Sequence, residues 1–170
     1  MNFRAKAFPV VALVALGLVV AGCGGGEKSY KAGTPAATGK APGCSVVPAD
    51  LVSQRLKRQV TGPVAETSLS GMTCTYPAAK SAGAGTTDQV QLNSDADKKS
   101  FDIYRKGLKQ AHNPVKSIDG YGDEAFASTV HSYADINNFA VRKGKVSVVI
   151  ISTADYKEIR TLMKDILAKL

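Results

Sequence analysis

Hydrophobic residues recur with helical spacing near the C-terminus, and this is the clearest periodic pattern in the chain. Between residues 154 and 170 they fall at intervals of three and four, and basic residues occupy the opposite side. The apolar stripe consists of Tyr156, Ile159, Leu162, Met163, Ile166, Leu167 and Leu170, and the basic side of Lys157, Arg160, Lys164 and Lys169. This pattern predicts an amphipathic helix, capped by Thr153, with one face packed on the rest of the fold.

Two further segments show helical spacing. The first has Pro48 in a position suited to a first helical turn and stops before Gly62-Pro63. The second can be capped by Ser94 or Asp95 and ends at Asn113-Pro114. Their apolar positions are Val47, Leu51, Val52 and Leu56 in the first, and Phe101, Tyr104, Leu108 and Ala111 in the second. Each pattern predicts a helix with one apolar side.

Alternating apolar and polar residues predict five strands, at 71–76, 88–94, 124–133, 136–142 and 145–152. Gly144 supplies the positive φ that a tight turn between the last two strands requires. The strand at 145–152 is apolar on nearly both faces, which places it inside the sheet. The element order αββαβββα predicts an α+β fold, an antiparallel β-sheet with helices packed on one face.

The N-terminus has the pattern of an export signal. Arg4 and Lys6 precede an apolar run over 7–20 that is too short to span a bilayer comfortably. The segment Val20-Ala21-Gly22-Cys23 then matches the bacterial lipobox, in which an aliphatic residue and two small residues precede a Cys. We therefore expect a lipoprotein signal peptide at 1–22 and lipidation of Cys23. The alternative is an ordinary signal peptide with a chance Cys at its cleavage site.

Composition divides the remaining chain in two. Residues 23–43 are rich in Gly, Pro, Lys and small residues without helical or strand period, which predicts a lipidated N-terminus and flexible tether. Removal of 22 of the 170 residues leaves 148, enough for one domain and not for two. We expect a single α+β domain over 44–170.

Cysteine usage fits an oxidising compartment. Once Cys23 carries lipid, Cys44 and Cys74 are left as a pair, and the simplest use of such a pair in an exported protein is one disulfide. In the chain-entropy model a bond closing this loop stabilises by about 3–4 kcal/mol. A metal site is the alternative, but no His stands at ligand spacing from either Cys.

Net charge narrows the choice of partners. The formal charge of +8 falls to +6 when Arg4 and Lys6 leave with the signal peptide. A basic surface on an exported protein favours anionic headgroups or wall polymers. We expect no nucleic-acid partner, because the export signal directs the chain out of the cytoplasm and the sequence has no recognisable binding motif. We expect contact with the membrane through the lipid on Cys23, and an unidentified envelope protein, lipid or wall component as partner.

Candidate catalytic groups are few. A Ser-His-Asp set can be drawn from Ser128 or Ser132, His131 and Asp135, but no nucleophile-elbow sequence supports it. His112 lies at the end of a predicted helix, where an imidazolium is favourable without any catalytic role. We expect no catalytic residue.

Paired carboxylates occur at Asp123-Glu124, between glycines. We interpret them as turn residues that cap or face solvent, with a cation or acid-base site as the alternative. Asp88, Asp95 and Asp97 lack the spacing of a calcium loop. We expect no metal or cofactor site.

Several short motifs together resemble small actinobacterial envelope lipoproteins that carry a domain of unknown function. The domain begins at Cys44, and the second Cys stands in Cys74-Thr75-Tyr76. The other motifs are the segment Gly120-Tyr121-Gly122-Asp123-Glu124-Ala125-Phe126, the Val141-Arg142-Lys143-Gly144 turn and the C-terminal amphipathic helix. The departures are Tyr76, where that group often has Trp, and Pro42-Gly43 before the first Cys of the domain, where an acidic residue and Pro are common. The resemblance covers 44–170 and implies architecture and location without an activity.

These observations predict a lipid-anchored lipoprotein on the extracytoplasmic face of the cell membrane. Its domain is expected to be a non-catalytic binding or accessory module of the cell envelope. The alternatives are a small envelope hydrolase or other enzyme, and a purely structural spacer.

Overall fold

The computed structural model describes residues 42–79 and 87–170. The expected signal peptide, Cys23 and nearly all of the expected tether lie outside the described residues. The described residues form a seven-stranded sheet in the order β1-β2-β3-β7-β6-β5-β4, in which all neighbouring strands are antiparallel. The strands are β1 (Val64–Ser68), β2 (Gly71–Pro77), β3 (Thr87–Asn93), β4 (Val115–Ser117), β5 (Glu124–His131), β6 (Asp135–Lys143) and β7 (Val146–Ser152).

Three α-helices and one 3-10 turn accompany this sheet in the described part of the chain. They are η1 (Cys44–Val46), α1 (Ala49–Leu56), α2 (Lys98–Gln110) and α3 (Tyr156–Leu167). The predicted α+β class with an antiparallel sheet is confirmed. The strands β1 and β4 are additions to the expected order, and both lie at sheet edges. Every residue of β1 is exposed, so this strand has no buried face to produce an alternating pattern.

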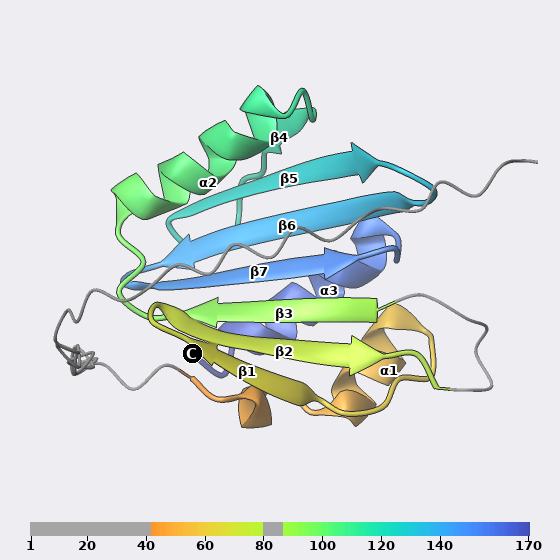
Figure 1. The fold of residues 1–170 in the computed structure, drawn as a ribbon. Coiled ribbons are helices and arrows are strands. Elements are labelled where there is room, and N and C mark those ends of the chain that lie inside the picture. The colour runs from red at the N-terminus through yellow and green to blue at the C-terminus, as the bar shows by residue number, and fades with distance from the viewer. Residues whose placement is uncertain (1–41, 80–86) are drawn as a thin grey trace, which may run out of the picture. The chain divides into compact units, whose positions relative to one another are not determined.

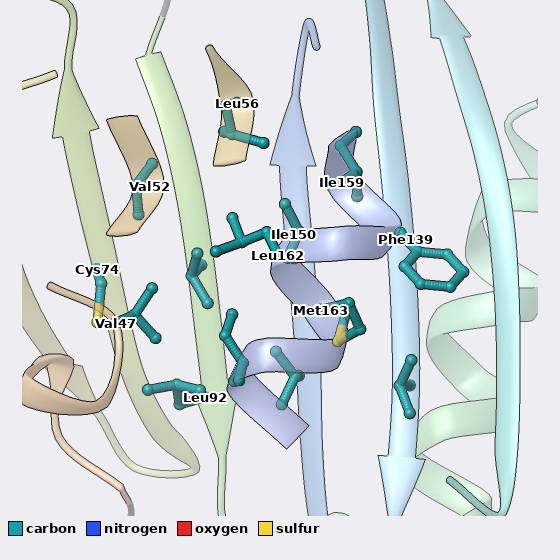
Figure 2. Close-up of a cluster of buried hydrophobic side chains, with 14 of the residues drawn as sticks. Val47, Val52, Leu56, Cys74, Leu92, Phe139, Ile150, Ile159, Leu162 and Met163 are labelled. Atoms are coloured by element: carbon teal, nitrogen blue, oxygen red, sulfur yellow. The ribbon is translucent and has the colours of Figure 1, made fainter. Parts of the chain in front are cut away.

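The larger core lies between the sheet and the pair α1 and α3, which pack on one face (Figure 1). The inward residues of β2 and β3 are those that the alternation predicted, with Cys74, Tyr76, Val90 and Leu92 at most 1% exposed. Figure 2 shows labelled side chains of α1 and α3 side by side in front of the strands of the sheet. Its labelled members are Val47, Val52, Leu56, Cys74, Leu92, Phe139, Ile150, Ile159, Leu162 and Met163.

A second, smaller core lies on the opposite face, where α2 covers the end of the sheet that contains β5 and β6. Phe101 of α2 packs on Phe126, Ala140 and Val149, each of which alternates with a residue of the larger core. The ring centroids of Phe101 and Phe126 are 5.1 Å apart. The prediction that β7 lies inside the sheet and is apolar on both faces is confirmed, because Val148 and Ile150 face α3 whereas Val149 faces α2.

The helix caps differ from the predicted ones. The side chain of Asp97, and not of Ser94 or Asp95, caps α2 by accepting a hydrogen bond from the Ser100 N–H over 2.7 Å. This bond lowers the pKa of Asp97. The N-cap residue of α3 is Asp155, and the predicted cap Thr153 instead accepts a hydrogen bond from the Arg58 guanidinium at 2.9 Å. A long-range contact also holds Ser94 in the loop before α2, because its N–H donates a hydrogen bond to the Ser70 carbonyl at 3.0 Å.

Cys44 and Cys74 form a disulfide, with their Cα atoms 5.7 Å apart. The bond joins η1 to the middle of β2 on the face that α1 and α3 cover. Beside it, the buried Tyr76 hydroxyl donates a hydrogen bond to the Val47 carbonyl. The predicted pairing of Cys44 with Cys74 is therefore confirmed, and the bond fixes the start of the domain to the sheet.

Candidate functional site

Helix α3 separates its charges onto two sides. Its acidic residues face α1, where Glu158 pairs with Lys57 at 3.0 Å and Asp165 pairs with Arg55. The basic residues Lys157, Arg160 and Lys164 recur at i, i+3 and i+7 on the other side. The acids of α3 are thus used to join two helices, and they do not neutralise the basic row.

The basic row borders a hollow of about 360 Å³, which we call the α3 cleft. It is lined by Tyr121, Lys157, Arg160, Thr161 and Lys164. Among the residues that the structure describes, no Asp or Glu lies within ion-pair distance of the three cationic groups. The Arg160 Nε atom is buried without a hydrogen-bond partner. The cleft therefore combines concentrated positive charge with unused donor capacity.

Tyr121 forms the wall of the α3 cleft that does not belong to α3. Its ring packs edge-on against Phe139 with centroids 5.0 Å apart, and the Lys164 Nζ atom lies 5.8 Å from its centroid. The loop that presents Tyr121 bends at Gly120 and Gly122, with φ of 82° and 53°. A Cβ at Gly122 would lie 2.4 Å from the Arg142 carbonyl oxygen, so only glycine allows this close approach.

The α3 cleft has the chemistry of an anion-binding site. Its guanidinium and two ammonium groups are hydrogen-bond donors with positive charge, and Tyr121 adds a hydroxyl group. The Thr161 hydroxyl already donates to the Lys157 carbonyl at 2.9 Å. The cleft holds no carboxylate or imidazole among its lining residues that could serve as a base. Sequence reasoning identified the three cations as a solvated helix side. It missed the cleft, because the position of Tyr121 depends on contacts between segments distant in the chain.

Asp123 binds backbone at a turn, as the sequence interpretation expected, whereas Glu124 pairs with Arg142 and does not simply face solvent. Asp123 Oδ2 accepts hydrogen bonds from the Gly144 N–H at 2.8 Å and from Arg142 Nη1 at 3.1 Å, and so closes the turn between β6 and β7. Glu124 Oε1 accepts from Arg142 Nη2 at 3.1 Å. Both carboxylates therefore form hydrogen bonds with the guanidinium of Arg142.

The candidate triad is only partly assembled. His131 Nδ1 and Asp135 Oδ1 are 2.8 Å apart at the β5–β6 turn, where their side chains are 68% and 67% exposed. Ser128 is 2% exposed and lies on the opposite face of β5, because odd and even residues of a strand alternate between faces. Ser132 lies in the exposed turn itself. The fold therefore separates Ser128 from His131 and provides no enclosure around the pair that does form.

His112 lies at the end of a helix, as predicted, and it belongs to the hydrogen-bonded motif that ends this helix. It follows the last turn of α2 with a φ of 59°, in the left-handed region. Its N–H donates to the Lys109 carbonyl and the Asn113 N–H donates to the Leu108 carbonyl, both at 3.0 Å. This is the Schellman arrangement that ends many helices, and it explains the position of His112 without catalysis.

Asp88 is a buried ionisable group whose burial was not predicted. The predicted strand at 88–94 begins with this residue, and the structure places it, 1% exposed, at the start of β3. Burial raises its pKa, while the hydrogen bond from Ser152 and the nearby Arg58 lower it by less. Asp95 lies in a turn and Asp97 caps α2, so the three carboxylates have separate roles. In residues 42–79 and 87–170, no three His, Cys, Asp or Glu side chains lie close enough to hold a metal ion.

Two further findings bear on the class of protein. No helix in the described ranges has the length and hydropathy that crossing a membrane requires. Comparisons with models of protein families, with curated proteins and with solved structures found no match.

Proposed function

We propose that this protein is a lipid-anchored, extracytoplasmic lipoprotein of the bacterial envelope, whose domain is a non-catalytic binding module. The observation that carries the proposed activity is the α3 cleft, in which three cations lack a carboxylate partner within the described chain. The cleft would bind a phosphate or carboxylate group of an envelope component. Its ligand is thus defined by negative charge and by hydrogen-bond acceptors.

The proposed location has two independent supports. The residues Val20-Ala21-Gly22-Cys23 follow a charged and apolar leader in the sequence, as lipidation requires. The disulfide between Cys44 and Cys74 is of the kind that forms and persists in oxidising compartments. Attachment through Cys23 would hold the domain near the membrane without a spanning helix.

The non-catalytic proposal is supported by the geometry of the candidate triad. Ser128 cannot reach His131 across the sheet, and the His131–Asp135 pair is open to solvent. General-base and nucleophilic catalysis need a nucleophile within hydrogen-bond reach of its base, in a site that limits water. The α3 cleft supplies charge without such a base.

Binding of soluble polyanions to the chain from residue 24 onward tests this function. Both core clusters lie between Cys44 and Ile166, so the chain without its leader and anchor keeps every core residue. Labelled polyphosphate and polyglutamate would serve as the phosphate and carboxylate probes in fluorescence anisotropy. We expect binding of one or both, weakened at least tenfold in a Lys157→Gln, Arg160→Gln, Lys164→Gln variant.

The matched control carries the same loss of charge at exposed positions outside α2 and α3, as Lys57→Gln, Lys143→Gln and Lys145→Gln. We expect the control to retain most of the affinity, apart from the general effect of three lost charges. Equal losses in the two variants would mean that only net charge matters. Equal losses, or no binding by the unmodified chain at physiological salt, would reject the cleft as the site.

A further inference from the structure

Helix α2 carries an exposed apolar residue within a basic surface. Ile103 is 61% exposed and lies one turn from Lys99 on one side and from Lys106 on the other. With Lys98 and Asp102, these residues border one surface hollow. The opposite side of the helix is fixed on the smaller core by Phe101, Tyr104 and Leu108. The Lys99–Ile103–Lys106 stripe therefore points away from the sheet.

The charge of this surface is nearly all of one sign. Between residues 98 and 110 there are five basic residues and a single acid, Asp102. Asp102 accepts a hydrogen bond from Lys98 at 2.8 Å, and Arg105 donates one to Ser117. Lys99, Lys106 and Lys109 make no ion pair among the described residues. Three ammonium groups are thus left to face a partner.

We infer that the Lys99–Ile103–Lys106 stripe docks the domain on an anionic lipid bilayer. Lysine stems can lie along the acyl boundary while their ammonium groups remain among phosphates, and Ile103 inserts between them. A protein partner fits this surface less well, because protein interfaces are depleted of Lys and anchored by aromatic residues and Arg. The stripe has neither of these anchors.

Docking through α2 would also orient the domain. The smaller core under α2 and the larger core under α3 lie on opposite faces of the sheet (Figure 1). A bilayer against α2 leaves the α3 cleft directed away from the membrane. This consequence rests on the proposed function of the cleft, whereas the docking itself does not.

Vesicle sedimentation of the chain from residue 24 onward, which lacks lipid, tests the docking. The vesicles contain phosphatidylcholine alone or with 30% phosphatidylglycerol. We expect at least tenfold stronger partitioning onto the anionic vesicles, and a loss of about tenfold or more in a Lys99→Gln, Lys106→Gln variant. The Lys57→Gln, Lys143→Gln variant loses the same charge at exposed positions outside both α2 and α3 and should partition nearly as the unmodified chain does.

A second measurement locates the contact. The chain contains no Trp, so Ile103→Trp introduces a single reporter into the stripe and Thr161→Trp introduces one on α3. We expect a blue shift and quenching by brominated lipid for the first reporter, and neither change for the second. Equal partitioning of the two charge variants, no preference for anionic vesicles, or a shift only at position 161 would overturn the inference. The polyanion assay does not depend on these outcomes, so failure of the docking is separable from failure of the cleft.

Discussion

Ser152 of β7 donates a hydrogen bond to Asp88 of β3, with 2.6 Å between Ser152 Oγ and Asp88 Oδ1. The same Ser152 Oγ atom accepts a hydrogen bond from the Ala154 N–H at 2.9 Å, and Arg58 Nη1 lies 3.5 Å from Asp88 Oδ1. The other carboxylate oxygen of Asp88 is buried without a partner among the described residues. The two central strands of the sheet are therefore joined through a carboxyl group that water does not reach.

This relationship predicts a pH-dependent stability. Burial raises the pKa of Asp88 in the folded protein above its value in the unfolded chain, so the folded state binds the proton more tightly. The stabilisation that this proton gives is complete below the unfolded pKa of about 4 and is lost as the pH rises through the folded pKa. We expect Asp88→Asn to unfold at a higher temperature than the unmodified protein at pH 7, and the difference to shrink toward pH 4.

Thermal unfolding followed by circular dichroism between pH 3.5 and 8 measures this difference. The control is Asp95→Asn, which removes an exposed carboxylate from a turn position that Asn tolerates. The change in unfolding temperature caused by Asp88→Asn is compared with that caused by Asp95→Asn at each pH. A lower unfolding temperature for Asp88→Asn at pH 7 would show that the Arg58 and Ser152 contacts outweigh the cost of burial.

The core strands and the last helix were predictable, because burial of one face of an element produces a regular spacing of apolar residues that can be read from the sequence. The alternation of Cys74 and Tyr76 with threonines places both residues in the core, as observed. Edge strands β1 and β4 were missed because neither has a buried face of any length. Only one side of the α3 cleft could be predicted from the sequence. Helical spacing places its cations on one side of α3, but tertiary contacts bring Tyr121 to them.

Loss of the disulfide should destabilise the domain strongly. We expect a Cys44→Ala, Cys74→Ala double variant to lose about 2–5 kcal/mol of unfolding free energy, because a bond that restricts the unfolded chain is removed. Urea unfolding under oxidising conditions measures the loss. Under a reductant the unmodified protein should move toward the variant. Peptide mapping without reduction should recover Cys44 linked to Cys74, and two free thiols in the native protein would contradict the pairing.

Lipidation at Cys23 remains a prediction from the sequence, since that residue lies outside the described residues. The intact mass of the membrane fraction should correspond to residues 23–170 plus a diacylglyceryl group. We expect Cys23→Ala to leave the protein unprocessed or to release it. A Cys23→Ala protein that is cleaved normally and stays on the membrane would place the anchor elsewhere. Carbonate washing of membranes, with Cys44→Ala, Cys74→Ala as the control for other thiols, distinguishes these outcomes.

Substitution of His112 by glycine should stabilise the folded protein. A non-glycine residue in the left-handed region costs about 1–2 kcal/mol, and His112 has a φ of 59° after the last turn of α2. We expect His112→Gly to gain about 0.5–1 kcal/mol, because part of the gain is offset by the greater freedom of glycine in the unfolded chain. His112→Ala retains the strain and should change little. Urea unfolding of both variants tests this, and a loss of stability in His112→Gly would mean that the imidazole makes a favourable contact.

Two glycines on either side of Tyr121 allow the turn and the α3 cleft to be tested together. A Cβ at Gly122 would lie 2.4 Å from the Arg142 carbonyl oxygen and 2.9 Å from a Val141 methyl carbon, whereas a Cβ at Gly120 meets nothing within 4 Å. Both positions have positive φ, so Gly120→Ala reports the cost of backbone strain alone. We expect it to cost about 1 kcal/mol and Gly122→Ala about 2–4 kcal/mol, because the latter adds overpacking against β6.

The shift forced at Gly122 should also move Tyr121 away from Lys164. We therefore expect Gly122→Ala to weaken polyanion binding at temperatures where the protein is still folded, and Gly120→Ala to leave it nearly unchanged. Urea unfolding and fluorescence anisotropy on the same samples separate the two effects. If Gly122→Ala lost stability but bound the probes as tightly as the unmodified chain, Tyr121 would be a packing residue of the larger core and not a wall of the binding site.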